Sequence, residues 1–181
     1  DNARLLDESK EADRLATAIL LYMGRLSRTE HSENQGNELI ELAQVVASLD
    51  GVREVVTTNL ASLSQQRLAE GIDLARLHDE TTLRFGDAVM GNLELAIETI
   101  GHPDPERCAE VIAAKAEIDA LAIAVLNGIL EKLQLGEESG VLSWRLASDI
   151  IGQFREVAHF SRSIARSTQN IQPMVESDEQ K

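Results

Sequence analysis

Apolar residues recur every three or four positions along almost the whole of this 181-residue chain. That spacing puts them on one face of an α-helix, whereas a half-buried strand needs alternation, and no segment of the sequence alternates. Five segments carry the helical spacing, at Leu15, Ile19, Met23 and Leu26; Leu42, Val45, Leu49, Val52, Val56 and Leu63; Leu83, Val89, Leu93 and Ile97; Ile118, Leu121, Val125, Ile129 and Leu133; and Leu142, Leu146, Ile150, Val157 and Ile164. The sequence therefore predicts an all-α fold of five long antiparallel helices.

The breaks between these helices are polar or contain glycine, and they fall at residues 27–36, 69–73, 101–107 and 135–140. The sharpest is "GHPDPER", where Gly101 suits a helix C-terminus, Asp104 an N-cap and Pro105 the first helical position. The break at 69–73 is softer, so helices two and three could run together or kink there. We expect the polar residues 173–181 to form a flexible tail.

The charge and the cysteine content exclude several classes of function. The 17 basic and 31 acidic residues give a net charge of −14, which repels nucleic acid phosphates and anionic lipid, so we expect no nucleic acid partner. The single cysteine, Cys108, excludes an internal disulfide and a Cys-based zinc site, and suits a reducing compartment. We find no signal peptide and no apolar run near the length of a membrane span. Because the chain begins at Asp1, without methionine, we expect it to be a piece of a longer protein.

A helix pair is repeated within the chain. "KEADRLATAIL" (10–20) matches "AEIDALAIAVL" (116–126) at an offset of 106, and "DGVREVV" (50–56) matches "GQFREVA" (152–158) at an offset of 102. The aligned pairs include Glu11 and Glu117, Asp13 and Asp119, Leu15 and Leu121, Arg53 and Arg155, and Glu54 and Glu156. Two matches in the same order indicate a duplication, although short Ala/Leu helices can also coincide by chance.

The duplication predicts two three-helix bundles in tandem. Helices three, four and five complete the second bundle, in residues 71–172, while residues 1–70 supply two helices of a first bundle that lacks its first helix in this chain. An apolar stripe would then be partly uncovered, and it includes Leu15, Ile19, Leu49 and Val56. We expect a helix before Asp1 to cover the stripe, or a symmetric homodimer through the first two helices. Helix three could instead bridge both bundles.

The chain resembles the PhoU-type helical domains, and in particular the version fused behind the membrane part of bacterial sodium-dependent phosphate cotransporters. The residues that carry the resemblance are "EADRLATAILLYMGRLS" (11–27), "LAQVVASLDGVREVVTTNLASL" (42–63), "FGDAVMGNLELAIETI" (85–100) and "VIAAKAEIDALAIAVLNGILEKL" (111–133). The resemblance implies a regulatory or interaction domain on the cytoplasmic side of the inner membrane. Its partners would be the transporter part of the same polypeptide or other phosphate-uptake proteins. A free-standing, soluble cytoplasmic, metal-binding regulator of phosphate uptake and signalling stays open, as does a carboxylate-metal enzyme.

The same resemblance implies a metal site. Members of the family hold metal ions with an acid, three residues and a second acid, once per bundle, and here Asp50 and Glu54 occupy these positions in the first copy. Residues four apart share one helix face, so two carboxylates can address one cation. In the second copy Gly152 replaces the first acid and Glu156 remains. Asp50, Glu54 and Glu156 are therefore the candidate ligands of a divalent or transition metal ion, and a solvated acidic face is the alternative.

The rest of the sequence predicts no enzyme. It has no glycine-rich phosphate loop, no nucleophile elbow and no cysteine with a placed histidine. Glu156 and His159 form half of a di-iron carboxylate motif, but no second half accompanies them. Phosphate is an unsuitable direct ligand, because the chain is acidic and its basic residues look scattered. The resemblance implies that Asp13 and Asp119 make polar contacts between helices. Packing roles are predicted for Trp144, Phe154 and Cys108.

Overall fold

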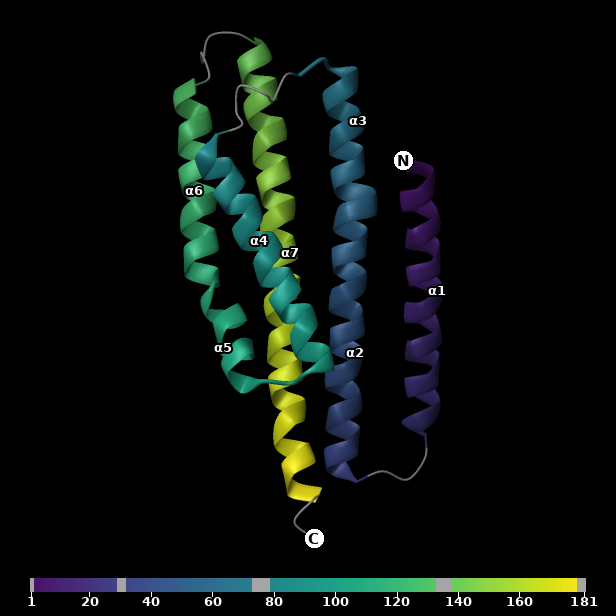
Figure 1. Ribbon diagram of the computed structural model, residues 1–181. Coiled ribbons are helices and arrows are strands. Elements are labelled where there is room, and N and C mark those ends of the chain that lie inside the picture. Colours follow the sequence, from purple (N-terminus) through teal and green to yellow (C-terminus); the bar gives the residue numbers. More distant parts are fainter. Residues whose placement is uncertain (1, 29–31, 73–78, 133–137, 179–181) are drawn as a thin grey trace.

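A computed structural model describes residues 2–28, 32–72, 79–132 and 138–178, and within these ranges the chain is helical, without a strand. The elements are α1 (Asn2–Leu26), α2 (Glu33–Glu54), the π-helical segment η1 (Val55–Leu60), α3 (Ala61–Ala69), α4 (Glu80–Gly101), α5 (Pro105–Ala113), α6 (Lys115–Lys132) and α7 (Glu138–Asp178). α2, η1 and α3 are contiguous, and only Ala114 separates α5 from α6, so the elements form five rods (Figure 1). The expected all-α helical bundle is confirmed.

The helix boundaries follow capping residues. Ser32 caps α2, since its hydroxyl accepts a hydrogen bond from the Gln35 amide and the Gln35 side chain accepts one from the Ser32 amide. α2 therefore begins inside the polar segment 27–36, which is a shorter break than the sequence suggested. The Asp104 carboxylate accepts hydrogen bonds from two amides of the first turn of α5, and Pro105 opens that helix as predicted.

The sequence predicted the end of α3 correctly but not the end of α7. α3 ends at Ala69, and Gly71 follows with φ +64°, a left-handed conformation that glycine adopts without strain. α7 begins at Glu138 and continues to Asp178, well beyond the last apolar position of the helical pattern. The residues expected to form a tail are thus helical from 173 to 178, and residues 179–181 lie outside the described ranges.

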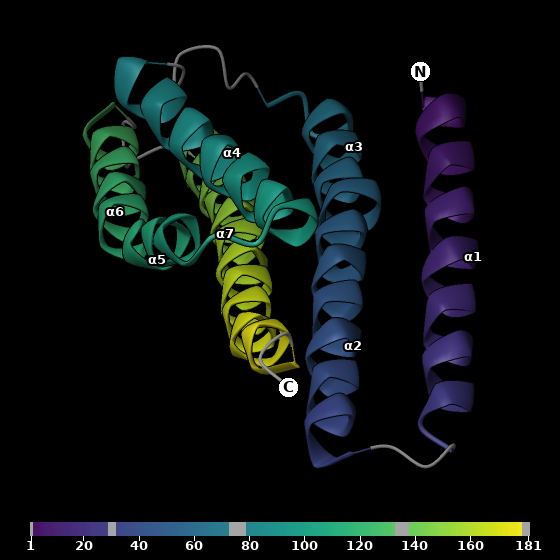
Figure 2. The same ribbon diagram turned by 60° about the horizontal axis from the view of Figure 1, so that its bottom comes forward.

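α4, the α5–α6 rod and α7 pack together as a three-helix bundle (Figures 1 and 2). Its core is apolar, with Phe85, Val89 and Leu93 from α4, Ile118, Ala122, Val125 and Ile129 from α6, and Ala147, Ile151, Val157 and Ala158 from α7, and Val55 of η1 packs into the same cluster. Phe154 and Trp144 pack against this core, as predicted, and the Phe154 ring lies 6.0 Å from the Phe85 ring. This bundle contains the second copy of the repeat.

α2 runs along α7, and α1 lies on the far side of α2 (Figures 1 and 2). Gly51 allows α2 to approach α7 closely, because a Cβ atom there would lie 2.4 Å from the Phe160 ring. Ser48 donates a hydrogen bond to Ser163 across the same seam, at 3.0 Å. α7 therefore packs against helices of both repeat copies, and the division into residues 1–70 and 71–172 stays a prediction.

A second cluster of buried side chains joins α2 to the three-helix bundle, through Val45, Ala96, Cys108, Val111, Ile164 and Ala165. Cys108 is fully buried there, which confirms its packing role, and burial raises the pKa of its thiol. Over the part of the chain that the structure describes, none of the helices combines the length and apolarity needed to cross a membrane.

Candidate functional site

The two repeated helix pairs form the same ion pair between their helices. In the first copy the Arg53 guanidinium on α2 lies 3.8 Å from the Asp13 carboxylate on α1. In the second copy Arg155 on α7 lies 3.1 Å from Asp119 on α6. These are the residues that the sequence repeat aligns, so the predicted interhelical contacts of both aspartates are confirmed. The repeated ion pair also supports the duplication of the helix pair.

The ion pair of the first copy belongs to a larger polar cluster. The Arg53 Nε donates a hydrogen bond to Asp50 at 2.7 Å, and its Nη1 donates one to the Ser9 hydroxyl at 3.0 Å. The hydrogen bond that Arg53 donates to Asp50 is the main cause that raises the pKa of Arg53. The side chain of Arg53 is 24% exposed, so it forms a half-buried link between α1 and α2.

In the second copy the cluster around the ion pair contains more bases than acids, whereas the first contains more acids than bases. Lys115 replaces Ser9 in the alignment and binds Asp119 at 2.5 Å, while Gly152 replaces Asp50. The hydrogen bond from Lys115 is the main cause that lowers the pKa of Asp119. The first cluster joins one arginine to two acids, whereas the second joins one acid to an arginine and a lysine.

A further arginine of α7, Arg162, is attracted to Asp119 of the second cluster. Burial lowers the pKa of Arg162, attraction to Asp119 opposes that shift, and repulsion from Arg166 and Arg155 adds to it. The basic residues look scattered in the sequence, because this cluster forms only when α6 and α7 come together. The spacing of Lys115 and Asp119, four residues apart on one helix, was the available signal.

The predicted metal ligands do not converge on one point in the described contacts. Asp50 binds Arg53, while Glu54 and Glu156 are exposed on α2 and α7. Among the residues that the structure describes, no three His, Cys, Asp or Glu side chains are grouped as a metal ion requires. The metal site stays a prediction. His159 is exposed and stacks edge-on against Phe160, at 5.7 Å between ring centres.

The main difference between the two helix pairs is an apolar surface that only the first exposes. It consists of two stripes, Leu15, Ile19 and Tyr22 on α1 and Leu42, Leu49 and Val56 on α2. At 100° per residue, and with α1 antiparallel to α2, both stripes fall on the same side of the pair. We call these six residues the open face. The predicted uncovered stripe, with Leu15, Ile19, Leu49 and Val56, is confirmed.

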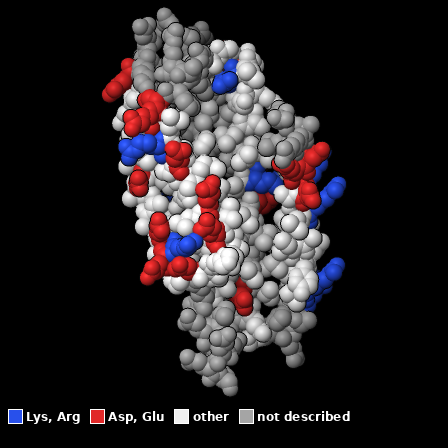
Figure 3. Space-filling model, viewed as in Figure 1, with Lys and Arg blue, Asp and Glu red and all other residues white. Residues whose placement is uncertain are grey.

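α4 covers the corresponding surface of the second pair. Ile19 is 39% exposed and aligns with Val125, which is 3% exposed; Leu49 is 36% exposed and aligns with Ile151, which is 5% exposed. Val125 and Ile151 belong to the core that α4 closes. Figure 2 shows α4 lying across α6 and α7, with one end beside the α2–α3 rod, and leaving α1 uncovered. Val45 of α2 and Ala96 of α4 share a buried cluster, so α4 reaches both helix pairs but does not cover α1. Figure 3, from the side of Figure 1, shows acidic side chains on the upper part of α1, uncharged surface below them and basic side chains at the outer edge.

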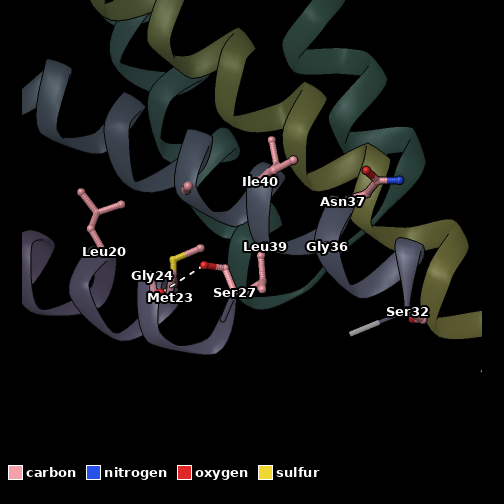
Figure 4. A pocket seen from close by; sticks show the side chains of 10 residues that line it. Leu20, Met23, Gly24, Ser27, Ser32, Gly36, Asn37, Leu39 and Ile40 are labelled. Carbon is pink, nitrogen blue, oxygen red and sulfur yellow. Dashed lines mark hydrogen bonds between the residues drawn. The ribbon is translucent and has the colours of Figure 1, made fainter. Parts of the chain in front are cut away.

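Two hollows lie near these helices. One, of about 700 Å³, is where α1 ends and α2 begins (Figure 4), and is lined by Leu20, Met23, Gly24, Ser27, Ser32, Gly36, Asn37, Leu39, Ile40 and Ala43. None of these ten side chains is ionisable, and the Ser27 hydroxyl donates to the Gly24 carbonyl at 3.1 Å. A polar hollow of about 450 Å³ between η1–α3 and α7 has Asp149 as its one ionisable lining residue.

Comparisons with protein families, with curated proteins and with solved structures give no match.

Proposed function

We propose that this chain is a regulatory interaction domain that receives an amphipathic partner helix on its open face. One observation carries the proposal: the same apolar stripes are buried under α4 in the second helix pair and uncovered in the first. The open face exposes on the order of 500 Å² of apolar side chain, which is the size of the largest patches on monomers, and such patches are often functional.

The covered pair indicates what the partner looks like. α4 inserts Phe85, Val89 and Leu93, spaced four residues apart, into the core between α6 and α7. A helix with a similar stripe can dock between α1 and α2 in the same way, as amphipathic helices do in hydrophobic grooves.

The resemblance to PhoU-type domains supplies a finer form of the proposal. In it, the domain regulates a sodium-dependent phosphate cotransporter-like membrane protein from the cytoplasmic side. The partner helix belongs to the transporter part of the same polypeptide or to another phosphate-uptake protein. Membrane-spanning segments encoded upstream of Asp1 in the complete reading frame are the expected finding. A free-standing metal-binding regulator that uses Asp50, Glu54 and Glu156 is the alternative, and a reading frame that encodes no such segments would favour it.

A labelled peptide of residues 80–101, the sequence of α4, tests the docking role. We expect saturable binding to the chain by fluorescence anisotropy, weakened at least tenfold by the double substitution Ile19→Asp and Leu49→Asp. Leu68→Asp is the matched control, because Leu68 is 69% exposed on α3 and lies outside the open face. Circular dichroism checks that all variants are folded. Binding that the double substitution leaves unchanged contradicts the proposal.

A further inference from the structure

We infer that a second copy of this chain occupies the open face, with the two α1 helices antiparallel across a two-fold axis. The inference rests on the proposed docking role of the open face and names its occupant. Three observations support it: the distribution of charge along α1, the position of the charged side chains beside the open face, and the apolar area available.

The charge of α1 is divided between its two halves. Residues 2–13 of α1 contain the four acids Asp7, Glu8, Glu11 and Asp13 and two bases, Arg4 and Lys10, which gives a net charge of −2. Residues 14–26 contain two bases, Arg14 and Arg25, and no acid, which gives +2, and Arg28 follows the helix. The eight charged side chains from Asp7 to Arg28 are exposed. A basic half-helix is unusual in a chain whose net charge is −14.

Antiparallel pairing brings these opposite halves together. Around a two-fold axis, the acidic half of each α1 lies against the basic half of the other, and the favourable contact occurs twice. A parallel arrangement would put acid against acid and base against base. The apolar stripes fit either direction, so charge selects the antiparallel one.

The spacing of two residues fixes the level of the axis. Asp7 and Arg25 are 18 residues apart, which is about five helical turns, so both lie at the same edge of the open face. When Asp7 of one copy faces Arg25 of the other, the axis passes at the level of Ala16, midway between them. The exposed Leu15 and Ile19 then lie next to the axis, where two copies bury them against each other.

The available area is sufficient for a specific interface. The open faces of two copies together bury on the order of 1,000 Å² of apolar surface, which is about the lower limit for a biological interface before the charged rim is counted. The helices α1 and α2 of both copies then form a four-helix arrangement around a shared apolar centre.

Sedimentation velocity tests the inference with a charge-reversal cycle. The 19.8 kDa chain should pass from monomer to dimer as its concentration increases over the micromolar range. Asp7→Arg or Arg25→Glu alone should weaken dimerisation at least tenfold, because each places like charges together twice. The double variant with both substitutions should restore it, since opposite charges again face each other. Ile19→Asp should abolish the dimer while leaving the helical circular dichroism signal unchanged.

Three results would overturn the inference. A dimer that Ile19→Asp leaves intact uses another surface, and a dimer that the double charge reversal does not rescue has another orientation. A chain that stays monomeric at all concentrations excludes a second copy as the occupant. If such a monomer still binds the α4 peptide, the proposed docking role stands. If it instead binds phosphatidylserine vesicles and loses that binding on Arg25→Glu, the open face meets a lipid surface.

Discussion

The helix pairs α1–α2 and α6–α7 share an aligned sequence and an aligned ion pair. The apolar face of the first pair is exposed to solvent, whereas the aligned face of the second pair is buried in the core. The difference is α4, which covers α6 and α7 and leaves α1 uncovered. Aligned apolar residues such as Ile19 and Val125 therefore have different tasks: the first is available to a partner, and the second holds the three-helix bundle together. The comparison shows that the third helix decides whether a helix pair of this kind becomes core or interface.

The largest expected effect on stability comes from placing an aspartate at Val125 and, for comparison, at the aligned Ile19. Val125→Asp should lower the free energy of unfolding by more than about 4 kcal/mol, or prevent folding, because it buries an unpaired carboxylate. Ile19→Asp should change it by less than about 1 kcal/mol, because the site is already solvated. Urea unfolding followed by circular dichroism measures both, at concentrations low enough for the chain to be monomeric. Similar losses for the two variants would contradict the assignment of core and interface.

A glycine in each pair offers the next comparison. Gly51→Ala should destabilise the chain by about 1–3 kcal/mol, because the new methyl group meets the Phe160 ring where α2 packs on α7. Gly152→Ala, on α7, should instead stabilise it by about 0.5–1 kcal/mol, since no atom lies within 4 Å and alanine favours the helix. Thermal unfolding should show a lower melting temperature for Gly51→Ala and a higher one for Gly152→Ala. A loss at Gly152 as large as that at Gly51 would show that helix packing is not the cause.

The sequence was sufficient for the features that depend on local pattern. Periodicity predicted the helices, the resemblance predicted the contacts of Asp13 and Asp119, and the repeat predicted the exposure of the apolar stripe. It missed the end of α7, because the apolar pattern stops at Ile164, whereas the helix continues to Asp178.

The candidate site was less predictable, because its contacts involve several helices. The acid motif suggested a metal ligand at Asp50, whereas Arg53, three residues further along the same face, binds that carboxylate in the structure. No local signal indicated that Gly51 would meet Phe160, or that Arg155 and Arg162 of α7 would approach Asp119 of α6. These arrangements depend on which helices become neighbours.

The arginines of the two ion pairs should differ in their contribution to stability. Arg53→Met should cost about 1–2 kcal/mol, because it removes half-buried hydrogen bonds to Asp50 and Ser9 as well as the ion pair with Asp13. Arg155→Met should cost about 0.5 kcal/mol, since that side chain is 54% exposed and its described ion pair is with Asp119 alone. Methionine keeps the apolar stem in both variants. Equal losses in urea unfolding would show that the larger cluster around Arg53 adds nothing.

The smallest expected effect concerns acid stability. Lys115 and Arg155 keep the pKa of Asp119 in the folded chain below its ordinary value, which is about 3.9 in an unfolded chain. Because the folded-state pKa is the lower one, the ionised carboxylate stabilises the fold above pH about 4, and this contribution disappears as the pH falls through the folded-state pKa. Asp119→Asn should therefore reduce stability at pH 7 and make the loss of stability below pH about 4 less steep. Asp13→Asn is the matched variant, and we expect a smaller change, because Asp13 is 62% exposed and lies 3.8 Å from Arg53. Urea unfolding at a series of pH values distinguishes the two, and a steeper acid dependence after Asp119→Asn would contradict the stabilising role of the ionised carboxylate.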